Sequence, residues 1–525
     1  MRPAAHNTTM RFVVARSVAA TVLLVVLQLA LLDGFWNHLD LHGYDGVVHL
    51  HNGIALASGQ MPEEWLAWAP IVTLVHGLSY AVGVPVHLMQ DTMTVLVSVA
   101  STTALCFLMR PLVGAAPALL VAALWATTPL VLHRAIGIAP PQTYLLSVAL
   151  CWFGAGMAVR RRWIPAALLL GLAAFERGEQ TLPIVAAAVV AAIRCRRDRR
   201  PLLLLAALAG AVFVFHQLHG PSHEHSWLAF RQHYASGAVM RGDAAAGADF
   251  ARPDATIVRD FGDASSPIAA IRRNPRAVAA HAMDNLVHLP VALDTLLLQP
   301  FGHAAAWRWT VLGAIGSLAA WIVWRRRTWM RRVLAARRET FVALGAGALA
   351  ALPIPLLLLP RPDLMTAVVP LAAMSLGLLL RSVASRRPIA AYCALGLVAA
   401  AIVFVPRPFA GGIAELREVR STVRILQRQA FRPGDVVCTA WSPQMSCFVR
   451  AGAGVRGVSL RSLQADTPEA CALAFAAAAP DVVLLSPSTI PELGTLGQVI
   501  AAELATDRWE IADYFFPTLS FRRVR

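Results

Sequence analysis

The chain has 525 residues, of which 57% are hydrophobic and 14% are charged, and its mean hydropathy is +0.58. This composition excludes an ordinary soluble protein and predicts a polytopic membrane protein. The formal net charge is +16, and arginine supplies all of the positive side chains because lysine is absent. The lysine-free, alanine-rich composition is typical of a GC-rich bacterial genome. No nucleic-acid-binding motif accompanies the arginines, so we expect no nucleic acid partner.

Apolar runs of spanning length predict about 11 transmembrane helices. The first run is read as a retained span rather than a cleaved signal peptide, because it is long and no A-x-A site follows it. The predicted spans are 12–32, 93–109, 112–132, 142–159, 164–175, 181–193, 202–218, 309–324, 340–359, 364–380 and 389–405.

Clusters of arginine predict the orientation, since positive residues favour the cytoplasmic side. All clusters fall on one side if the N-terminus is cytoplasmic and if 71–88 does not cross the membrane. We therefore expect 71–88 to form a helix at the outer interface, broken by Gly77, Gly83 and Pro85. The predicted location is the bacterial cytoplasmic (inner) membrane, with these clusters inside: 160–162, 194–200, 325–338 and 381–387.

This topology divides the chain into a transmembrane domain over 1–405 and an extracytoplasmic α/β domain over 406–525. The transmembrane domain carries two outer loops, 33–92 and 219–308. In the second loop a helix is predicted after a proline, and its apolar side is expected to contain Ala277, Ala280, Leu286 and Leu289.

The pattern of the C-terminal domain is mixed α/β. It predicts an amphipathic helix over 413–429, strands at 434–440 and 481–486, a helix after Pro491 and a final pair of strands. Cys438 and Cys447 lie close in sequence, and either a disulfide or two reduced thiols would fit their spacing.

The first outer loop is acidic in a basic protein. No lysine or arginine occurs between Arg16 and Arg110. Asp40 and Asp45 follow the first span closely, where a carboxylate could activate a hydroxyl beside the bilayer. A solvated acidic loop is the alternative. The six carboxylates of the loop are Asp33, Asp40, Asp45, Glu63, Glu64 and Asp91.

Three arginines are expected at the outer membrane boundary: Arg177, Arg134 and Arg361. Arginine there can bind a phosphate with two parallel hydrogen bonds. Arg177 lies in FERGEQ with Glu176 and Glu179, and a hairpin turn with a local ion pair is the alternative for this motif.

Histidines suggest a weaker metal hypothesis. They gather beside Glu224, but no HExxH motif occurs and Gly220 and Pro221 interrupt the run. No cofactor is assigned, and a divalent metal is left as an alternative. The histidines of this region are His216, His219, His223, His225 and His233.

Four segments carry a resemblance to a known family. They are YDGVVHLHNGIALASGQMP with its acid and small-residue helix, LGLAAFERGEQTLPIV, RRNPRAVAAHAMDNL with its Asn-Pro helix, and RPDLMTAVVPLAA. Together with the predicted topology they resemble the GT-C superfamily of integral membrane glycosyltransferases, of the protein mannosyltransferase and aminoarabinose transferase type.

The resemblance implies an enzyme that transfers a sugar from a polyprenyl-phosphate donor to a hydroxyl of a lipid, glycan or protein on the outer face of the membrane. It maps the catalytic acid best onto Asp45 and second onto Asp40, and the phosphate-binding arginines onto Arg177 and Arg361. Gly46 follows Asp45 where the family often has a second acid, and His49 stands at an aromatic position.

Two other functions compete with this one. Broken helices around 164–193 and 71–88 could line the path of a transporter or flippase of lipid-linked sugars. A non-catalytic envelope assembly protein would use the C-terminal domain for interaction. An enzyme should bring Asp40 or Asp45 and one of the boundary arginines to the same cavity.

Overall fold

The computed structural model contains many helices and one small sheet. By contacts it divides into two compact units. Unit 1 comprises Met1–Leu32, Glu63–Val72 and Thr94–Arg407, and unit 2 comprises Asp33–Pro62, Thr73–Met93 and Pro408–Arg525. The residues described are 18–19, 21–32, 44–60, 69–84, 86–128, 130–132, 141–194, 199–218, 220–243, 245, 253–297, 317, 324–325, 327–384, 421–422, 424–426, 428–440, 454–486, 489–515 and 518–524.

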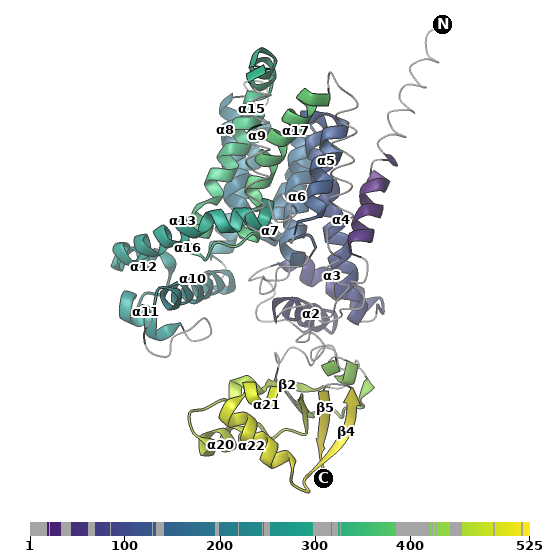
Figure 1. Cartoon of the computed structure of the whole chain (residues 1–525), viewed down its shortest axis with the longest axis vertical. Coiled ribbons are helices and arrows are strands. Elements are labelled where there is room, and N and C mark those ends of the chain that lie inside the picture. Colours follow the sequence, from purple (N-terminus) through teal and green to yellow (C-terminus); the bar gives the residue numbers. More distant parts are fainter. Residues whose placement is uncertain are drawn as a thin grey trace. The chain divides into compact units, whose positions relative to one another are not determined.

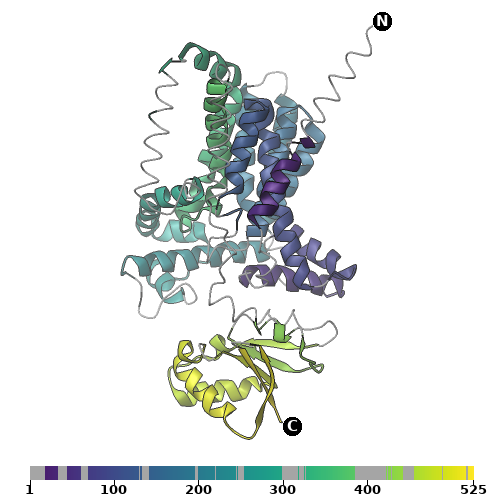
Figure 2. The same cartoon turned by 45° about the vertical axis from the view of Figure 1, so that its right-hand side comes forward.

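Unit 1 is built on a bundle of apolar helices that run side by side (Figures 1 and 2). Helix α6 packs against α7, while α8 packs against both α9 and α15. At Gly154 of α6 a Cβ would approach Leu170 Cγ to 2.7 Å, so glycine permits the close crossing with α7. The helices are α4 (Val86–Val113), α5 (Ala115–Ala126), α6 (Pro141–Val159), α7 (Trp163–Glu176), α8 (Thr181–Arg194), α9 (Arg199–Leu218), α15 (Arg327–Ala351) and α17 (Val369–Ala384).

Among the described residues, 4 helices are long and apolar enough to cross a membrane: Thr92–Val113, Gln142–Val159, Arg327–Leu357 and Asp363–Ser382. Each overlaps a predicted span. The predicted spans at 309–324 and 389–405 lie almost wholly outside the described residues, so the total of about 11 stays a prediction. Shorter apolar helices include Thr21–Leu31 and three others: Ala115–Ala126, Trp163–Glu176 and Pro468–Ala478.

The segment 220–297, predicted as part of the second outer loop, folds into helices that share a small core. Phe230, Tyr234, Phe261 and Val278 are buried together in it. In Figures 1 and 2, α13 runs across the direction of the bundle helices. The helices are α10 (Gly220–Met240), α11 (Asp254–Phe261), α12 (Pro267–Arg273) and α13 (Pro275–Leu297).

The predicted helix after Pro275 is present as α13, and of its predicted apolar side Ala277 packs against this core. Leu286 is 46% exposed, whereas His281 and Asn285 are buried at 0% and 2%. The hydrophobic pattern failed here because two polar side chains find hydrogen-bond partners inside the protein, which offsets the cost of burying them.

Unit 2 contains a sheet of five strands in the order β2-β1-β3-β5-β4. Strands β1, β2 and β3 are parallel, and the β4–β5 hairpin joins β3 in antiparallel fashion. The strands predicted at 434–440 and 481–486 and the final pair are confirmed, while β2 was not predicted. The strands are β1 (Val436–Thr439), β2 (Arg456–Ser459), β3 (Val482–Leu485), β4 (Trp509–Phe515) and β5 (Thr518–Arg523).

The two faces of this sheet have different partners, as the alternation of side chains along a strand requires. Val483 and Leu485 face a core formed with α20 (Pro468–Ala478) and α22 (Gly494–Leu504). Val482 and Leu484 face a second core, which contains Leu50 of α2 (Tyr44–Ala57), Met89, Ile425 and Leu426. A helix of the acidic loop and the C-terminal sheet therefore share one core.

Helix α3 (Pro70–Ala81) continues through Gly77, which was predicted to break it. A Cβ at Gly53 of α2 would lie 2.8 Å from Gly77 N, and one at Gly77 would lie 2.7 Å from Gly53 O. Gly77 is therefore a point of close helix contact, and the chain turns instead at Gly83, where φ is +83°.

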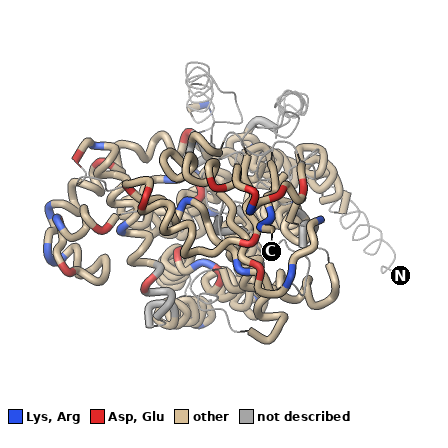
Figure 3. The backbone as a smooth tube through the Cα atoms, turned by 90° about the horizontal axis from the view of Figure 1, so that it is seen from below, with Lys and Arg blue, Asp and Glu red and all other residues tan. Residues whose placement is uncertain are grey.

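Basic and acidic residues are interspersed along the described chain, as Figure 3 shows. Cys438 is buried in β1 and is free of any disulfide within the described residues. Cys447 lies outside those residues, as does most of the helix predicted at 413–429.

Candidate functional site

Tyr144, at the start of α6, joins two arginines from distant parts of unit 1. Arg361 Nη2 donates a hydrogen bond of 3.1 Å to the Tyr144 hydroxyl. The guanidinium carbon of Arg177 lies 3.9 Å from the centre of the Tyr144 ring, a cation–π contact. The structure therefore brings together two of the three predicted boundary arginines.

Arg177 occupies the break between α7 and α8. Its backbone is extended, with φ −141° and ψ 108°, so α7 ends and the short helix η2 (Gly178–Gln180) follows. Its side chain is only 6% exposed, and Nη2 lies 2.6 Å from Glu179 Oε1. The local ion pair considered from the sequence is thus present, and it holds a buried cation.

Arg361 occupies a second break in the bundle, between α16 (Pro353–Leu357) and η4 (Asp363–Val368). Flanking prolines at 360 and 362 keep this segment from continuing either helix. Arg361 Nη2 donates to Asp363 Oδ2 at 2.8 Å, and the Asp363 side chain is fully buried.

Each arginine keeps donors that are not used by the protein. Within the part of the chain that the structure describes, Arg177 Nε and Nη1 and Arg361 Nε are buried and have no hydrogen-bond partner. Buried donors are normally satisfied, so such groups call for a ligand, water or ion. The oxygens of a phosphate fit arginine donors of this kind.

Glu176, the neighbouring acid of FERGEQ, holds the start of α3. Its Oε2 accepts a hydrogen bond of 2.7 Å from Ile71 N, and its backbone carbonyl accepts one of 3.0 Å from Ala69 N. A carboxylate at a helix N-terminus satisfies amides that have no partner within the helix. The two acids of the motif thus have different partners: Glu176 binds the N-terminus of α3, and Glu179 forms the ion pair with Arg177.

The predicted residues of the first loop are only partly described. Asp45 lies in the first turn of α2, but its side chain, like Asp40 and Arg134, falls outside the described residues. His49 is buried at 1%, and its Nδ1 lies 3.2 Å from Thr73 Oγ1, which joins α2 to α3.

His233, on α10, is a site residue that the sequence indicated only as a possible metal ligand. Burial lowers its pKa to about 3, and the positive charge of Arg361 is the next largest cause of this lowering. The group is therefore a neutral imidazole at physiological pH. The side chains of His216, His219, His223 and His225 are outside the description, and the described residues contain no group of three potential metal ligands.

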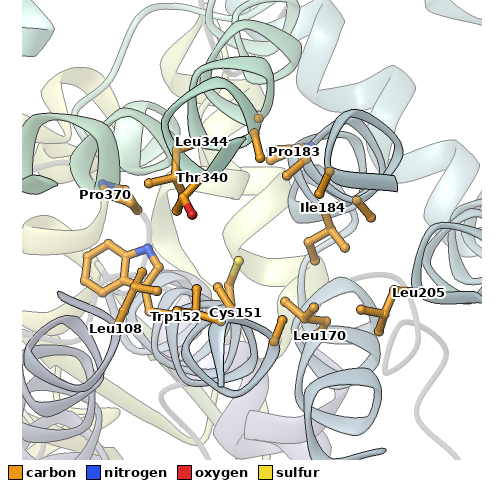
Figure 4. Close-up of a pocket in the computed structure, with 18 of the residues that line it drawn as sticks. Leu108, Cys151, Trp152, Leu170, Pro183, Ile184, Leu205, Thr340, Leu344 and Pro370 are labelled. Atoms are coloured by element: carbon orange, nitrogen blue, oxygen red, sulfur yellow. The ribbon is translucent and has the colours of Figure 1, made fainter. Parts of the chain in front are cut away.

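A mostly apolar cavity of about 340 Å³ lies among the helices of the bundle, and Arg161, Arg337 and Glu339 also line it. Figure 4 shows Trp152, Cys151 and Leu108 on one side and Leu344, Thr340 and Pro183 on the other. Gln180 and Thr366 also line it. Gln180 N bonds to Arg177 O and Thr366 Oγ1 bonds to Asp363 O, so the cavity adjoins both arginine segments.

Tyr144, Asp363 and His233 complete the arginine site, and sequence reasoning assigned no role in it to any of them. A tyrosine at the end of a predicted span is usually an interfacial anchor, so its position gave little signal. Asp363 was within reach, because an acid two residues after Arg361 in a hydrophobic context suggests an ion pair.

The fold of the chain, with its apolar helices of membrane-spanning length, is similar to that of solved oligosaccharyltransferases. Solved structures with a similar fold include the archaeal oligosaccharyltransferase AglB from Archaeoglobus fulgidus in complex with an inhibitory peptide and a dolichol-phosphate. That likeness covers 97% of this chain and 74% of AglB, with a TM-score of 0.50 and 12% identity.

The Archaeoglobus fulgidus oligosaccharyltransferase in complex with Zn and sulfate is similar as well, over 96% of this chain and 73% of the other, with a TM-score of 0.50 and 12% identity. No family model matches the chain, and no curated protein is significantly similar to it in sequence. The resemblance to the GT-C superfamily drawn from the sequence is thus confirmed at the level of the fold.

Proposed function

We propose that the chain is a membrane glycosyltransferase that transfers a sugar from a polyprenyl-phosphate donor to an acceptor hydroxyl on the outer face of the cytoplasmic membrane. The observation that carries this proposal is the buried pair Arg177 and Arg361 around Tyr144, with unused donors, beside an apolar cavity in a GT-C fold.

The two arginines bind the phosphate of the donor. Each already has a carboxylate partner, so neither carries an unbalanced charge at membrane depth when the donor is absent. Their remaining N–H groups hydrogen-bond the phosphate and stabilise the charge that grows on it as the sugar leaves. The apolar cavity takes part of the isoprenoid chain, since its lining offers aliphatic and aromatic contacts.

The transfer step is a displacement at the anomeric carbon. The acceptor oxygen forms a bond to this carbon while the bond from the carbon to the phosphate oxygen breaks, so polyprenyl phosphate leaves and the configuration inverts. Asp45 accepts the hydroxyl proton or activates the hydroxyl by a hydrogen bond, with Asp40 as the second candidate. His49 supports this acid by joining α2 to Thr73 of α3.

Dolichol-phosphate and peptide are the molecules bound in the AglB structure. For the present chain, the same chemistry of a lipid phosphate and a nucleophile suggests a lipid-linked sugar donor. The acceptor is a lipid, glycan or protein hydroxyl, and membrane lipids surround the bundle.

The test uses the purified full-length protein in liposomes with radiolabelled polyprenyl-phosphate monosaccharides and a delipidated membrane extract as acceptor. We expect release of polyprenyl phosphate together with label in an acceptor fraction. Movement of intact labelled donor between leaflets, without release of polyprenyl phosphate, would support a flippase instead. Neither release nor movement with any donor tested would support an assembly protein.

A further inference from the structure

Helix α13 presents two buried polar side chains, one turn apart, to the segment that precedes Arg361. His281 and Asn285 are 0% and 2% exposed. Buried polar groups on a helix that could have been apolar need an explanation, because their burial is favourable only when their hydrogen bonds are made.

Three consecutive backbone carbonyls receive these hydrogen bonds. Asn285 Nδ2 donates to Leu356 O at 2.9 Å and to Leu358 O at 2.7 Å. His281 Nε2 lies 3.2 Å from Leu357 O. Asn285 Nδ2 also lies 3.1 Å from His281 Nε2. Because the two amide protons of Asn285 are directed to the carbonyls of Leu356 and Leu358, we assign the proton of His281 to Nε2, which donates it to Leu357 O.

These carbonyls lie at the C-terminal end of a short helix. Helix α16 ends at Leu357, and the last carbonyls of a helix have no partner within it. The prolines that flank Arg361 lack backbone N–H groups, so the following residues supply few donors. His281 and Asn285 act as a side-chain cap supplied by another helix, three residues before Arg361.

The His281 ring, which forms part of this cap, is packed closely against α10. The His281 ring lies 5.2 Å from the Tyr234 ring. A Cβ at Gly237 would come within 2.9 Å of the imidazole, so glycine leaves room for the ring. Asn274 Oδ1 accepts from Ala277 N at 3.1 Å and fixes the start of α13. His281 therefore packs against the core that helices α10 to α13 share.

We propose that His281 and Asn285 are positioning residues that hold the 356–358 segment and thereby fix Arg361 for phosphate binding. The inference rests on the proposed function for the role of the phosphate, whereas the positioning itself concerns only the protein. Arg361 Nη2 donates to both Tyr144 and Asp363. Movement of the 356–358 segment would therefore displace the other N–H groups of Arg361, which are the ones proposed to bind the phosphate.

Hydrogen–deuterium exchange of the full-length protein in detergent tests the positioning directly. Asn285→Asp keeps the shape of the side chain but removes both donors, and we expect at least tenfold faster exchange in the peptide covering 353–364. His281→Leu should act in the same direction. His281→Gln retains an N–H near the position of Nε2 and should exchange close to the wild type. His288→Ala is the matched control, since His288 is exposed on the same helix and its Nδ1 lies 2.8 Å from Asp284 O.

A second measurement is the binding of undecaprenyl phosphate by native mass spectrometry. We expect roughly tenfold weaker binding for Asn285→Asp and His281→Leu, and unchanged binding for His281→Gln and His288→Ala. If Asn285→Asp folds poorly, the His281 pair gives the same comparison at a single position.

The two measurements separate the two proposals. Unchanged exchange at 353–364 in both donor-deleting variants would overturn the positioning inference, whatever the lipid result. Absence of binding of undecaprenyl phosphate to the wild type would count against the proposed function, and the exchange result would still decide the positioning. Faster exchange with unchanged lipid binding would contradict the link between this segment and the phosphate.

Discussion

Arg361 donates a hydrogen bond of 3.1 Å to the hydroxyl of Tyr144, a residue 217 positions earlier in the chain. The ring of the same tyrosine lies under Arg177, at 3.9 Å from the guanidinium carbon to the ring centre. One side chain therefore orders two cations that would otherwise repel each other, and its two parts have separable roles.

Tyr144→Phe should remove only the contact with Arg361. Since a lost hydrogen bond to a charged group costs roughly 1.5–3 kcal/mol, we expect binding of undecaprenyl phosphate to weaken by about tenfold or more. Tyr144→Leu should weaken it further because the cation–π contact is lost as well. Native mass spectrometry measures both, and Tyr514→Phe, at an exposed position, is the control. Equal affinities of the wild type and Tyr144→Leu for undecaprenyl phosphate would contradict a role of Tyr144 in phosphate binding.

Asp45→Asn tests the proposed activating group. The amide cannot accept the proton of the acceptor, so we expect sugar transfer to fall by about 10²–10⁴-fold with folding intact. Turnover in liposomes and the thermal unfolding midpoint are measured together. Asp40→Asn in parallel distinguishes the two acids. Unchanged turnover of Asp45→Asn would refute the role of Asp45.

Glu176→Leu should destabilise unit 1, because the first amides of α3 lose the carboxylate that accepts from Ile71 N at 2.7 Å. The loss of a helix cap costs about 0.5–2 kcal/mol, and Glu176→Gln should cost less because its carbonyl still accepts. Thermal unfolding in detergent checks this, with Glu224→Gln, exposed on α10, as control. A Leu variant as stable as the control would show that the contact adds nothing.

The protein should lose stability on mild acidification. Burial lowers the pKa of His281 to about 4 and of His233 to about 3, below the usual value near 6.5. Between these pKa values the histidines bind protons in the unfolded chain but not in the folded protein. The free energy of unfolding is therefore highest above pH 6.5 and decreases as the pH drops toward 4. The unfolding midpoint of the wild type should decrease over this interval. His281→Gln should decrease less steeply, and identical slopes would contradict the expectation.

Leu50→Ala should destabilise unit 2 by about 2–5 kcal/mol, because Leu50 is fully buried in the core that α2 shares with the sheet. Limited proteolysis followed by detection of the C-terminal fragment measures the effect. Leu473→Ala is the matched control, since Leu473 is 73% exposed on α20. Equal protection of both variants would mean that α2 contributes nothing to this core.

The sequence was most informative where a single physical signal dominated. Apolar runs located the bundle, because a membrane helix must be uniformly apolar over its length. Alternation and turn residues located most of the strands, as for 481–486. Arg177 and Arg361 stood out because charged residues are rare in such a context.

The rest depended on contacts between distant segments. Nothing local indicates that Tyr144 would meet both arginines, or that His281 and Asn285 would face a run of carbonyls. Gly77 was misread because a glycine that breaks a helix and one that permits close helix packing have the same letter. In each case the deciding partner lies on another helix.

The core shared by Leu50 and Val482 also sets an order of events during biosynthesis. Helix α2 is made early, just after the first apolar segment, yet the strand that covers it is synthesised only after nearly all of the bundle. The apolar face of the helix that carries Asp45 therefore stays partly exposed until the C-terminal sheet has been synthesised. A chain truncated before 482 would lack Val482 and Leu484 of this core, so the packing of the helix that carries the proposed catalytic acid depends in part on the last segment of the protein to be made.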